Sequence, residues 1–437
     1  MNFVKGLMLG TVAAFAVTTA QAADLPLKAK AVEYVKVCSL YGAGFYYIPG
    51  TDTCIKLGGY LRADVTINGS GAYNAPAWSG DAGRKNRLAN TYIFRSRQDI
   101  NLDTRTATEY GVVRTFFDAT FNWTTGSDTI ANGSLGVYYA FVQFAGFTFG
   151  KAVSQFDTPW TGYPGNNSSF LLGGYDDVTG INQVSYTAEF GNGVSASISL
   201  EDQSAYLQSN LWNATGITAA TFPTGINGTN SYAGTQVPDI VGKVRVDQAW
   251  GLFQVSAAAH QVRAAYYNLA NETSGHPSDT WGYAVQGALS IKNLPTGPGD
   301  SINLTATYSN GATRYVLGGV TGNSFAIYGN SGVAYQSIAF GGAGDGTFAG
   351  TTVLNGTGIQ KTNAWGVRGA FNHNWNPYWS TSLFGAYTSI DYNGTATALI
   401  CGAATAVITG VGTCNPDFNI AQIGQVTRWT PVKNLTF

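Results

Sequence analysis

Residue types that commonly carry catalysis are few and scattered in this chain. Its three histidines, His260, His276 and His373, are accompanied by no Gly-x-Ser-x-Gly motif and by no metal-ligand spacing. An enzyme site needs a nucleophile, a base or a metal held close together, and no motif assembles such groups. We therefore expect no catalytic residue, no bound metal and no cofactor.

Charged side chains, in contrast, recur at every second position of several segments. Between Tyr92 and Arg105, apolar residues share one face and charged residues share the other. The same alternation runs through 55–67, 111–123 and 240–250. The charged residues of these polar faces are Arg62, Asp64, Arg95, Arg97, Asp99, Asp103, Arg105, Arg114, Asp118, Lys243, Arg245 and Asp247. Opposite charges that line a narrow passage create a transverse field, which orients dipolar solutes and disfavours apolar ones.

The segments that carry these charges have the length and pattern of tilted membrane strands. Helical periodicity is hard to find. Short turns at 191–193, 250–251, 376–378 and 430–434 contrast with long polar stretches at 154–180, 203–237, 309–360 and 393–416. Short turns on one side and long loops on the other are typical of outer-membrane barrels. We therefore predict an all-β fold, a transmembrane antiparallel β-barrel, with polar-face charges that line its pore.

The composition favours the same class. Charged residues make up 11% of the chain and aromatic residues 13%, whereas soluble domains carry about 25% charged residues. A barrel resolves this deficit because every second side chain of a strand meets lipid. Tryptophans near predicted strand ends fit membrane girdles, with core packing of a soluble β-protein as the alternative; they are Trp123, Trp250, Trp281, Trp365, Trp379 and Trp429. The net charge of −1 predicts no nucleic-acid partner.

The first 22 residues predict a secretory signal peptide. Lys5 supplies a positive start, 7–17 is apolar, and Ala20-Gln21-Ala22 fits a cleavage site. A transmembrane helix is the alternative, but the apolar stretch is well short of the ~20 residues that a bilayer requires. Residues 23–437 then form one barrel domain, exported through the periplasm to the outer membrane of a Gram-negative cell.

Four cysteines lie in two close pairs, Cys38 with Cys54 and Cys401 with Cys414. Because export passes through an oxidising periplasm, we expect each pair to form a local disulfide. Metal binding is the alternative, although the spacing matches no zinc pattern and no histidine lies near either pair.

Three segments resemble the general porins of alphaproteobacteria, the porin type 2 family. They are CSLYGAGFYYIPGTDTC at 38–54 with its continuation to Arg62, FVQFAGFTFGK at 141–151, and WTPVKN at 429–434. The resemblance spans most of the chain after the signal peptide. It implies sixteen strands, a homotrimer, and a third extracellular loop that folds inward to narrow the pore. In that loop, within 154–180, Asp157, Asp176 and Asp177 would oppose the arginines.

The C-terminal residues depart from the family pattern. Phe437 and Leu435 fit the alternation of a final barrel strand, but Lys433 and Pro431 occupy the preceding alternate places. Since proline cannot donate to a sheet, 431–434 predicts a turn and 435–437 the first residues of a further strand. We therefore expect that one or two C-terminal strands of the family's barrel are missing from this sequence.

Together these features predict a porin. It would form a passive, water-filled channel for small hydrophilic solutes and ions, in contact with outer-membrane lipid and lipopolysaccharide. A substrate-selective porin is one alternative, marked by an aromatic track or a one-signed basic ladder in the lumen. A barrel that serves as an adhesin or structural anchor is another, and it predicts a plugged, non-conducting lumen.

Overall fold

The computed structural model describes ten stretches of the chain. They are 36–67, 90–126, 128–129, 133–160, 171–175, 179–218, 230–318, 324–328, 337–407 and 413–437. The predicted signal peptide at 1–22 lies outside the described residues, and so do Asp176 and Asp177 of the predicted constriction loop.

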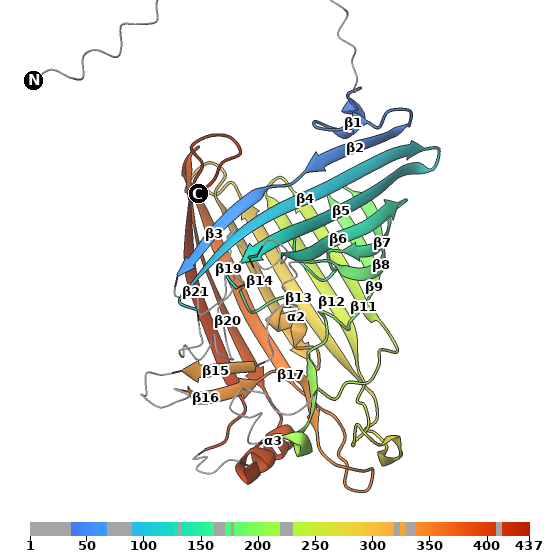
Figure 1. Cartoon of the computed structure of the whole chain (residues 1–437), viewed down its shortest axis with the longest axis vertical. Helices are drawn as coiled ribbons and strands as arrows, with labels where there is room; N and C mark the ends of the chain where they lie inside the picture. Colours follow the sequence, from blue (N-terminus) through green and yellow to red (C-terminus); the bar gives the residue numbers. More distant parts are fainter. Residues whose placement is uncertain are drawn as a thin grey trace, which may run out of the picture.

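Sixteen strands of the described residues form one antiparallel sheet, in which each strand pairs with the next one along the chain, except that β2 and β3 both pair with β4 (Figure 1). The strands are β1 (Tyr46–Tyr47), β2 (Thr53–Gly58), β3 (Leu61–Ile67), β4 (Tyr92–Thr108), β5 (Gly111–Thr124), β6 (Ser134–Phe144), β7 (Phe147–Ala152), β8 (Ile181–Gly191), β9 (Val194–Glu201), β11 (Asp239–Gln248), β12 (Gly251–Val262), β13 (Thr280–Lys292), β14 (Ser301–Asn310), β19 (Asn363–Asn376), β20 (Trp379–Asp391) and β21 (Phe418–Trp429). This confirms the predicted antiparallel all-β fold.

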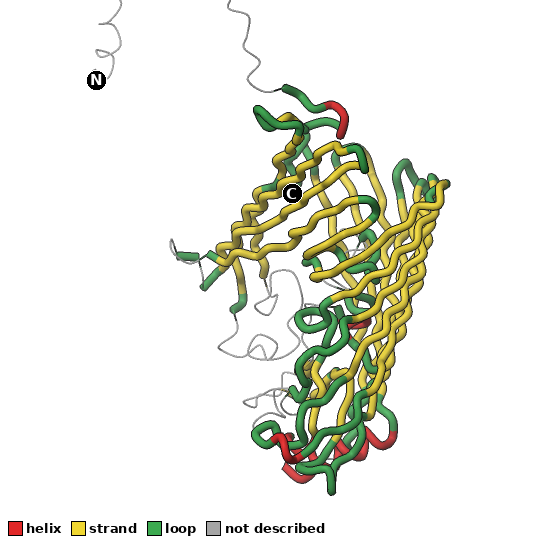
Figure 2. The backbone as a smooth tube through the Cα atoms, turned by 90° about the vertical axis from the view of Figure 1, so that its right-hand side faces the viewer, coloured by secondary structure: helices red, strands yellow, loops and turns green. Residues whose placement is uncertain are grey.

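The sheet curls around a concave side on which loop segments lie (Figure 2). Its two ends do not meet in this structure: β3 pairs with β4, β21 pairs with β20, and no pairing joins β3 to β21 among the described strands. The outer-membrane barrel architecture is therefore present as an open, curved sheet.

The segment 55–67, predicted as one strand, is divided into β2 and β3 by Gly59 and Tyr60. Both halves pair with β4, and the amide of Asp99 donates to the Tyr60 carbonyl at 2.8 Å. The division arises because Gly59 has a φ of 138°, a backbone conformation that bends the strand and that side-chain-bearing residues rarely adopt.

Burial along the strands is the inverse of that in a soluble protein. In β12, Gln254 and His260 on the concave face are at most 1% exposed, whereas Phe253 and Val255 on the outward face are 46% and 47% exposed. An outward face of apolar side chains is stable when it meets lipid, and polar side chains then face the interior. The predicted alternation is confirmed, with the orientation of a membrane barrel.

Aromatic side chains gather at both ends of the outward face. At one end, the Tyr283 and Tyr308 ring centroids are 6.1 Å apart, those of Trp365 and Tyr387 are 5.5 Å apart, and Tyr308 pairs with Trp365 across the ladder. At the other end, Trp379 and Trp429 stack at 5.8 Å. The eight residue-to-residue steps from Trp379 to Tyr387 on β20 span about 27 Å along the strand, or about 21 Å across the membrane at ~40° tilt. These rows fit the predicted girdles, and Trp123, Trp250 and Trp281 also lie exposed at strand ends.

The short and long connections lie as predicted, but the long ones contain regular structure that sequence reasoning missed. They hold the three-stranded sheet of β10 (Asn210–Asn213), β17 (Gly344–Phe348) and β18 (Gln360–Lys361), the hairpin of β15 (Ser324–Tyr328) and β16 (Ser337–Gly342), α2 (Arg314–Leu317) and α3 (Gly394–Val407), with 3-10 turns at Ser39–Tyr41, Ala214–Gly216 and Glu272–Ser274. No helix of the described residues is long and apolar enough to cross a membrane.

Both expected disulfides are present. Cys38 is bonded to Cys54 with Cα atoms 6.1 Å apart, and Cys401 to Cys414 with Cα atoms 5.6 Å apart. The first closes the loop before β2, and the second links α3 to the residues that precede β21.

The predicted turn at 431–434 is also present, and the residues after it return along β21. The Phe437 amide donates to the Trp429 carbonyl at 2.8 Å, and the Trp429 amide donates back at 2.9 Å. The two rings stack at 5.4 Å, which extends the aromatic row by one position.

Candidate functional site

The charged residues of β3 to β5 lie together on one face of the sheet, as predicted. The first group centres on Asp64, which is the ladder partner of Arg95. Arg62 Nε donates to Asp64 Oδ1 at 2.6 Å, and Arg95 Nε donates to Asp64 Oδ2 at 2.7 Å. Two guanidinium groups therefore share one carboxylate, which leaves the group with a net positive charge.

A second group of the same composition centres on Asp103. Arg105 and Arg114 face each other across β4 and β5, and each brings Nη2 to 3.1 Å from Asp103 Oδ2. The Arg114 guanidinium also donates to Gln143 Oε1 at 2.9 Å and lies 5.1 Å from the centroid of the Phe116 ring. Arginine and aromatic side chains thus alternate on this part of the wall.

Arg97, Asp99 and Asp118 lie between these two groups. Arg97 Nε donates to Asn122 Oδ1 at 2.6 Å, and its guanidinium lies 5.6 Å from the Tyr138 ring centroid. Asp99 accepts from Asn101 at 3.3 Å, and Asp118 pairs with Asn101 across the ladder. The face from β3 to β5 therefore carries both signs of charge along its length.

The three remaining predicted residues lie farther along the sheet, on β11. Lys243 Nζ donates to Gln155 Oε1 of the loop after β7 at 2.7 Å. Arg245 and Asp247 form an ion pair at 2.6 Å, and both are partly exposed. The structure therefore separates the predicted charges into a wall at β3 to β5 and a smaller set at β11.

The loop after β7, predicted to fold inward, lies against the concave face. Ser154 Oγ and the Gln155 amide donate to the Glu201 carboxylate at 2.6 and 2.8 Å, and Gln254 Nε2 donates to the Asp157 carbonyl at 2.8 Å. Trp160 Nε1 donates to Thr305 Oγ1 at 3.3 Å. The outgoing arm, 153–160, thus crosses the sheet from β9 to β14.

Asp157 lies in this arm, but its side chain is 3% exposed, and Oδ1 accepts from the Thr158 amide at 2.8 Å. The Asp157 carboxylate is therefore buried. A role of Asp157 at the pore constriction stays a prediction.

The return arm of the same loop, 171–175, lies farther across the sheet. Arg368 of β19 donates to the carbonyls of Leu171 and Tyr175 at 3.2 and 2.5 Å. The Leu172 amide donates to Gln422 Oε1 of β21 at 2.8 Å. Both described arms are therefore fixed to the face that carries the polar residues.

A buried polar network holds a second group of loop segments to the wall. His260 Nδ1 lies 2.8 Å from Asp239 Oδ1, and its Nε2 lies 3.1 Å from the Tyr232 hydroxyl. Tyr315 of α2 donates to Asp239 Oδ2 at 2.7 Å, and Tyr232 donates to Asp345 Oδ2 at 2.9 Å. Burial raises the pKa of Tyr232 and Tyr315 well above the ordinary value, so both hydroxyls remain donors.

Asp345 of β17 closes this network. Its carboxylate accepts the Ser209 amide at 2.7 Å and the Thr313 amide and hydroxyl at 2.7 and 3.0 Å. Segments before β10 and before α2 are thereby joined to β17. Sequence analysis assigned no role to Asp239, Asp345, Glu201 or Arg368; their positions on strand faces or in a glycine-rich loop carried no local motif.

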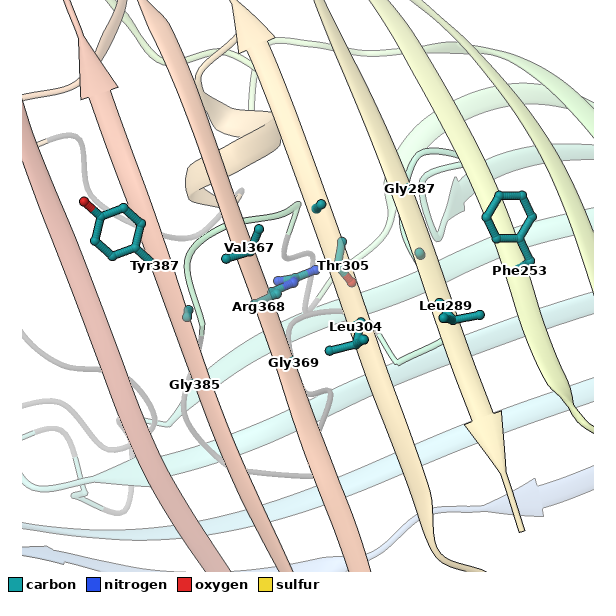
Figure 3. A pocket seen from close by; sticks show the side chains of 13 residues that line it. Phe253, Gly287, Leu289, Leu304, Thr305, Val367, Arg368, Gly369, Gly385 and Tyr387 are labelled. Atoms are coloured by element: carbon teal, nitrogen blue, oxygen red, sulfur yellow. The ribbon is translucent and has the colours of Figure 1, made fainter. Parts of the chain in front are cut away.

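The outward face offers no comparable chemistry. A groove of about 620 Å3 crosses β12 to β20 where Gly287 and Gly369 lie between the larger Phe253, Leu289 and Tyr387 (Figure 3). Its exposed lining is almost wholly apolar. In the part of the chain that the structure describes, no cluster of His, Cys, Asp and Glu could hold a metal ion.

An apolar outward face with aromatic rows, a polar concave face and an inward loop define the class of outer-membrane β-barrel channels. The family model described as "Porin subfamily" matches residues 24–437. The chain belongs to this porin subfamily, and its function is that of an outer-membrane porin, a channel for the diffusion of small solutes.

Relatives and a solved structure agree with this assignment. Porin Omp2b of Brucella abortus (strain 2308) is 31% identical over 348 residues, which cover 76% of this chain and 81% of that protein. Porin Omp2b of Brucella suis is 31% identical over 347 residues, with the same coverage. The outer membrane channel DcaP of Acinetobacter baumannii matches 89% of both chains with a TM-score of 0.60 at 16% identity, which supports the fold.

Proposed function

We propose that the pore is narrowest where the described arms of the loop after β7, 153–160 and 171–175, face the charged wall of β3 to β5. The observation that carries this proposal is the attachment of both described loop arms to the concave face, from Glu201 on β9 to Gln422 on β21. In a closed barrel, the edge strand β21 would adjoin β3, and β12 and β13, in the middle of that part of the sheet, would stand across the lumen from β3 to β5. Solutes would then pass between the loop and the arginine-aspartate groups.

In this proposal, Arg62, Arg95, Arg97, Arg105 and Arg114 give the wall an excess of positive charge over Asp64, Asp99, Asp103 and Asp118. Lys243, Arg245 and Asp247 line a second stretch. Ions of both signs pass, and the wall favours anions because a fixed charge raises the local concentration of its counterion.

Replacement of a wall charge tests this arrangement. Arg62→Gln removes one positive charge, so the reversal potential in a salt gradient shifts toward cations, with a permeability ratio changed by about twofold. Arg263→Gln is the matched control, because its side chain is also 38% exposed, has one carboxylate partner and lies in a loop after β12. A reversal potential that Arg62→Gln leaves unchanged would remove this residue from the pore wall.

A substrate-selective porin remains a second candidate, because aromatic rings accompany the arginines on the wall. Phe116 and Phe141 lie 5.4 Å apart beside Arg114. Such a track would favour solutes that combine an apolar ring with an anionic group. Liposome swelling with neutral and anionic solutes of equal size separates the candidates, since dependence on chemistry rather than size supports selectivity.

Two further parts of the proposal concern the oligomeric state of the protein and its export. We propose a homotrimer embedded in outer-membrane lipid and lipopolysaccharide, formed after cleavage behind Ala22. The family assignment supports the trimer, as do the exposed outward-facing Val142, Phe147 and Phe149 on β6 and β7. Chemical cross-linking in detergent and N-terminal sequencing of the exported protein test the two statements.

A further inference from the structure

We propose that Arg368 is a positioning residue that holds the return arm of the constriction loop, 171–175, against the wall and so sets the open cross-section of the pore. The proposal rests on the proposed function of the loop after β7. It adds a residue that contacts no solute and acts through the loop.

One guanidinium group holds both ends of the return arm. Arg368 Nη1 donates to the Leu171 carbonyl at 3.2 Å, and Nη2 donates to the Tyr175 carbonyl at 2.5 Å. The side chain is 2% exposed. Because the guanidinium is a planar fork with fixed donor directions, it fixes the orientation of the arm as well as its distance from the wall.

The arm has a sequence that allows this close approach. Gly173 has a φ of 94°, a conformation that favours glycine. A Cβ atom at Gly174 would lie 2.8 Å from Arg368 Nε and 2.9 Å from Cζ. A side chain at Gly174 would therefore displace the guanidinium from the carbonyls that it holds.

The residues around Arg368 on the concave face of β19 have small side chains. The neighbouring concave-face positions of β19 are Ala364, Gly366 and Ala370, which are buried beneath the loop layer. Arg368 is the large residue among them, and burial of its charge is costly unless its donors are satisfied. The two loop carbonyls supply acceptors, which links the free energy of this buried arginine to the position of the loop.

The outgoing arm is held by the direct neighbour of Arg368. Thr305 on β14 is its ladder partner, and Thr305 Oγ1 accepts from Trp160 Nε1 at 3.3 Å. Figure 3 shows Arg368 and Thr305 side by side on adjacent strands. Both described arms of the loop are therefore attached to one cross-strand pair.

Two further backbone amides of the return arm join it to another loop segment. The amides of Gly173 and Gly174 donate to the Val316 carbonyl of α2 at 2.8 and 3.0 Å. Leu172 packs with Val316 of α2 and Ile400 of α3 in one buried cluster. Loss of the Arg368 contacts would leave these attachments in place, so we expect the arm to shift and fluctuate rather than unfold.

The test uses the full-length protein, reconstituted in planar bilayers, with Arg368→Met and Arg368→Lys. Methionine fills similar space without donors, so the arm moves toward the lumen, and mean single-channel conductance falls by about twofold with increased open-channel noise. Lysine keeps the charge and can donate to a carbonyl but lacks the planar fork of arginine, so it restores part of the conductance. Gly174→Ala retains Arg368 but displaces its guanidinium group from the loop carbonyls. It should therefore change conductance and noise in the same direction as Arg368→Met.

Arg263→Met, the same substitution at a partly exposed arginine in a loop after β12, is the control and keeps wild-type currents. Heat-induced mobility shifts on gels establish separately that each variant is folded. Conductance and open-channel noise then report the position of the loop. Wild-type conductance and noise in folded Arg368→Met would overturn the proposal; if that variant does not fold, wild-type currents in both Arg368→Lys and Gly174→Ala overturn it. Absence of current in the unmodified protein would instead refute the proposed pore.

Discussion

At the scale of single residues, the concave face carries buried carboxylates that accept hydrogen bonds from several loop and strand residues. Asp345 accepts from Ser209, Thr313 and Tyr232, and Asp239 accepts from His260 and Tyr315. A buried charge without such partners would cost several kcal/mol. These groups therefore fasten the loop segments to the wall at defined positions.

Removal of one hydroxyl from this network should destabilise the folded protein. Tyr315→Phe takes away the 2.7 Å donor to Asp239 and leaves a buried carboxylate with one partner fewer. We expect a loss of about 1–3 kcal/mol in the free energy of unfolding, measured by urea titration in detergent. Tyr266→Phe, at an exposed ring, is the control; equal stability of the two variants would contradict the role of the network.

The turn before β14 should respond to acid through Asp300. Its carboxylate accepts from Thr296 Oγ1 at 2.6 Å, the Asn374 amide at 2.9 Å and His373 Nδ1 at 2.7 Å. These bonds, the one from Thr296 first, lower the pKa of Asp300 to about 2. Because the folded-state pKa lies below the ordinary value, the stabilisation is present above about pH 4 and is lost as the pH falls toward 2.

Unfolding midpoints between pH 2 and pH 6 check this statement. Asp300→Asn should remove the part of the pH dependence that the carboxylate contributes. Thr296→Ala should raise the pKa of Asp300 and move the loss of stability to higher pH. A midpoint whose pH dependence is the same in all three proteins would show that Asp300 is not coupled to folding.

At the scale of elements, period-two alternation predicted strands of the large sheet because one face of each must be apolar for lipid, but it did not reveal the short strands inside the long connections. The same rule explains why the Gly59 interruption and helix α3 (Gly394–Val407) were missed: both depend on neighbours rather than on alternation. Arg368 and Glu201 were missed for a related reason. Their partners, Tyr175 and Ser154, lie 193 and 47 residues away along the chain, and no local motif predicts contacts at such separations.

The lipid-facing role of the outward face can be tested on one strand. Val255→Arg places a charge at the middle of the exposed face of β12 and should cost about 2–4 kcal/mol for folding into vesicles. Val353→Arg, at a position of the loop after β17 that is 61% exposed, should cost almost nothing because its charge remains in water. Equal folding free energies for the two variants would show that this face does not meet the membrane interior.

At the scale of the whole molecule, the two faces of one curved sheet have different roles in a channel. The outward face, with its aromatic rows, matches the bilayer, while the concave face carries the charges and holds the loop layer. This division predicts permeation without an energy source, because no step needs more than diffusion through water. It also distinguishes a pore from a surface anchor, whose lumen would be blocked.

Single-channel recording of the purified, unmodified protein in a planar bilayer tests this account most directly. A passive porin gives stepwise currents that are ohmic in applied voltage and that persist without any added cofactor or energy source. Insertion of folded protein, verified by its heat-dependent gel mobility, without any current steps would contradict it.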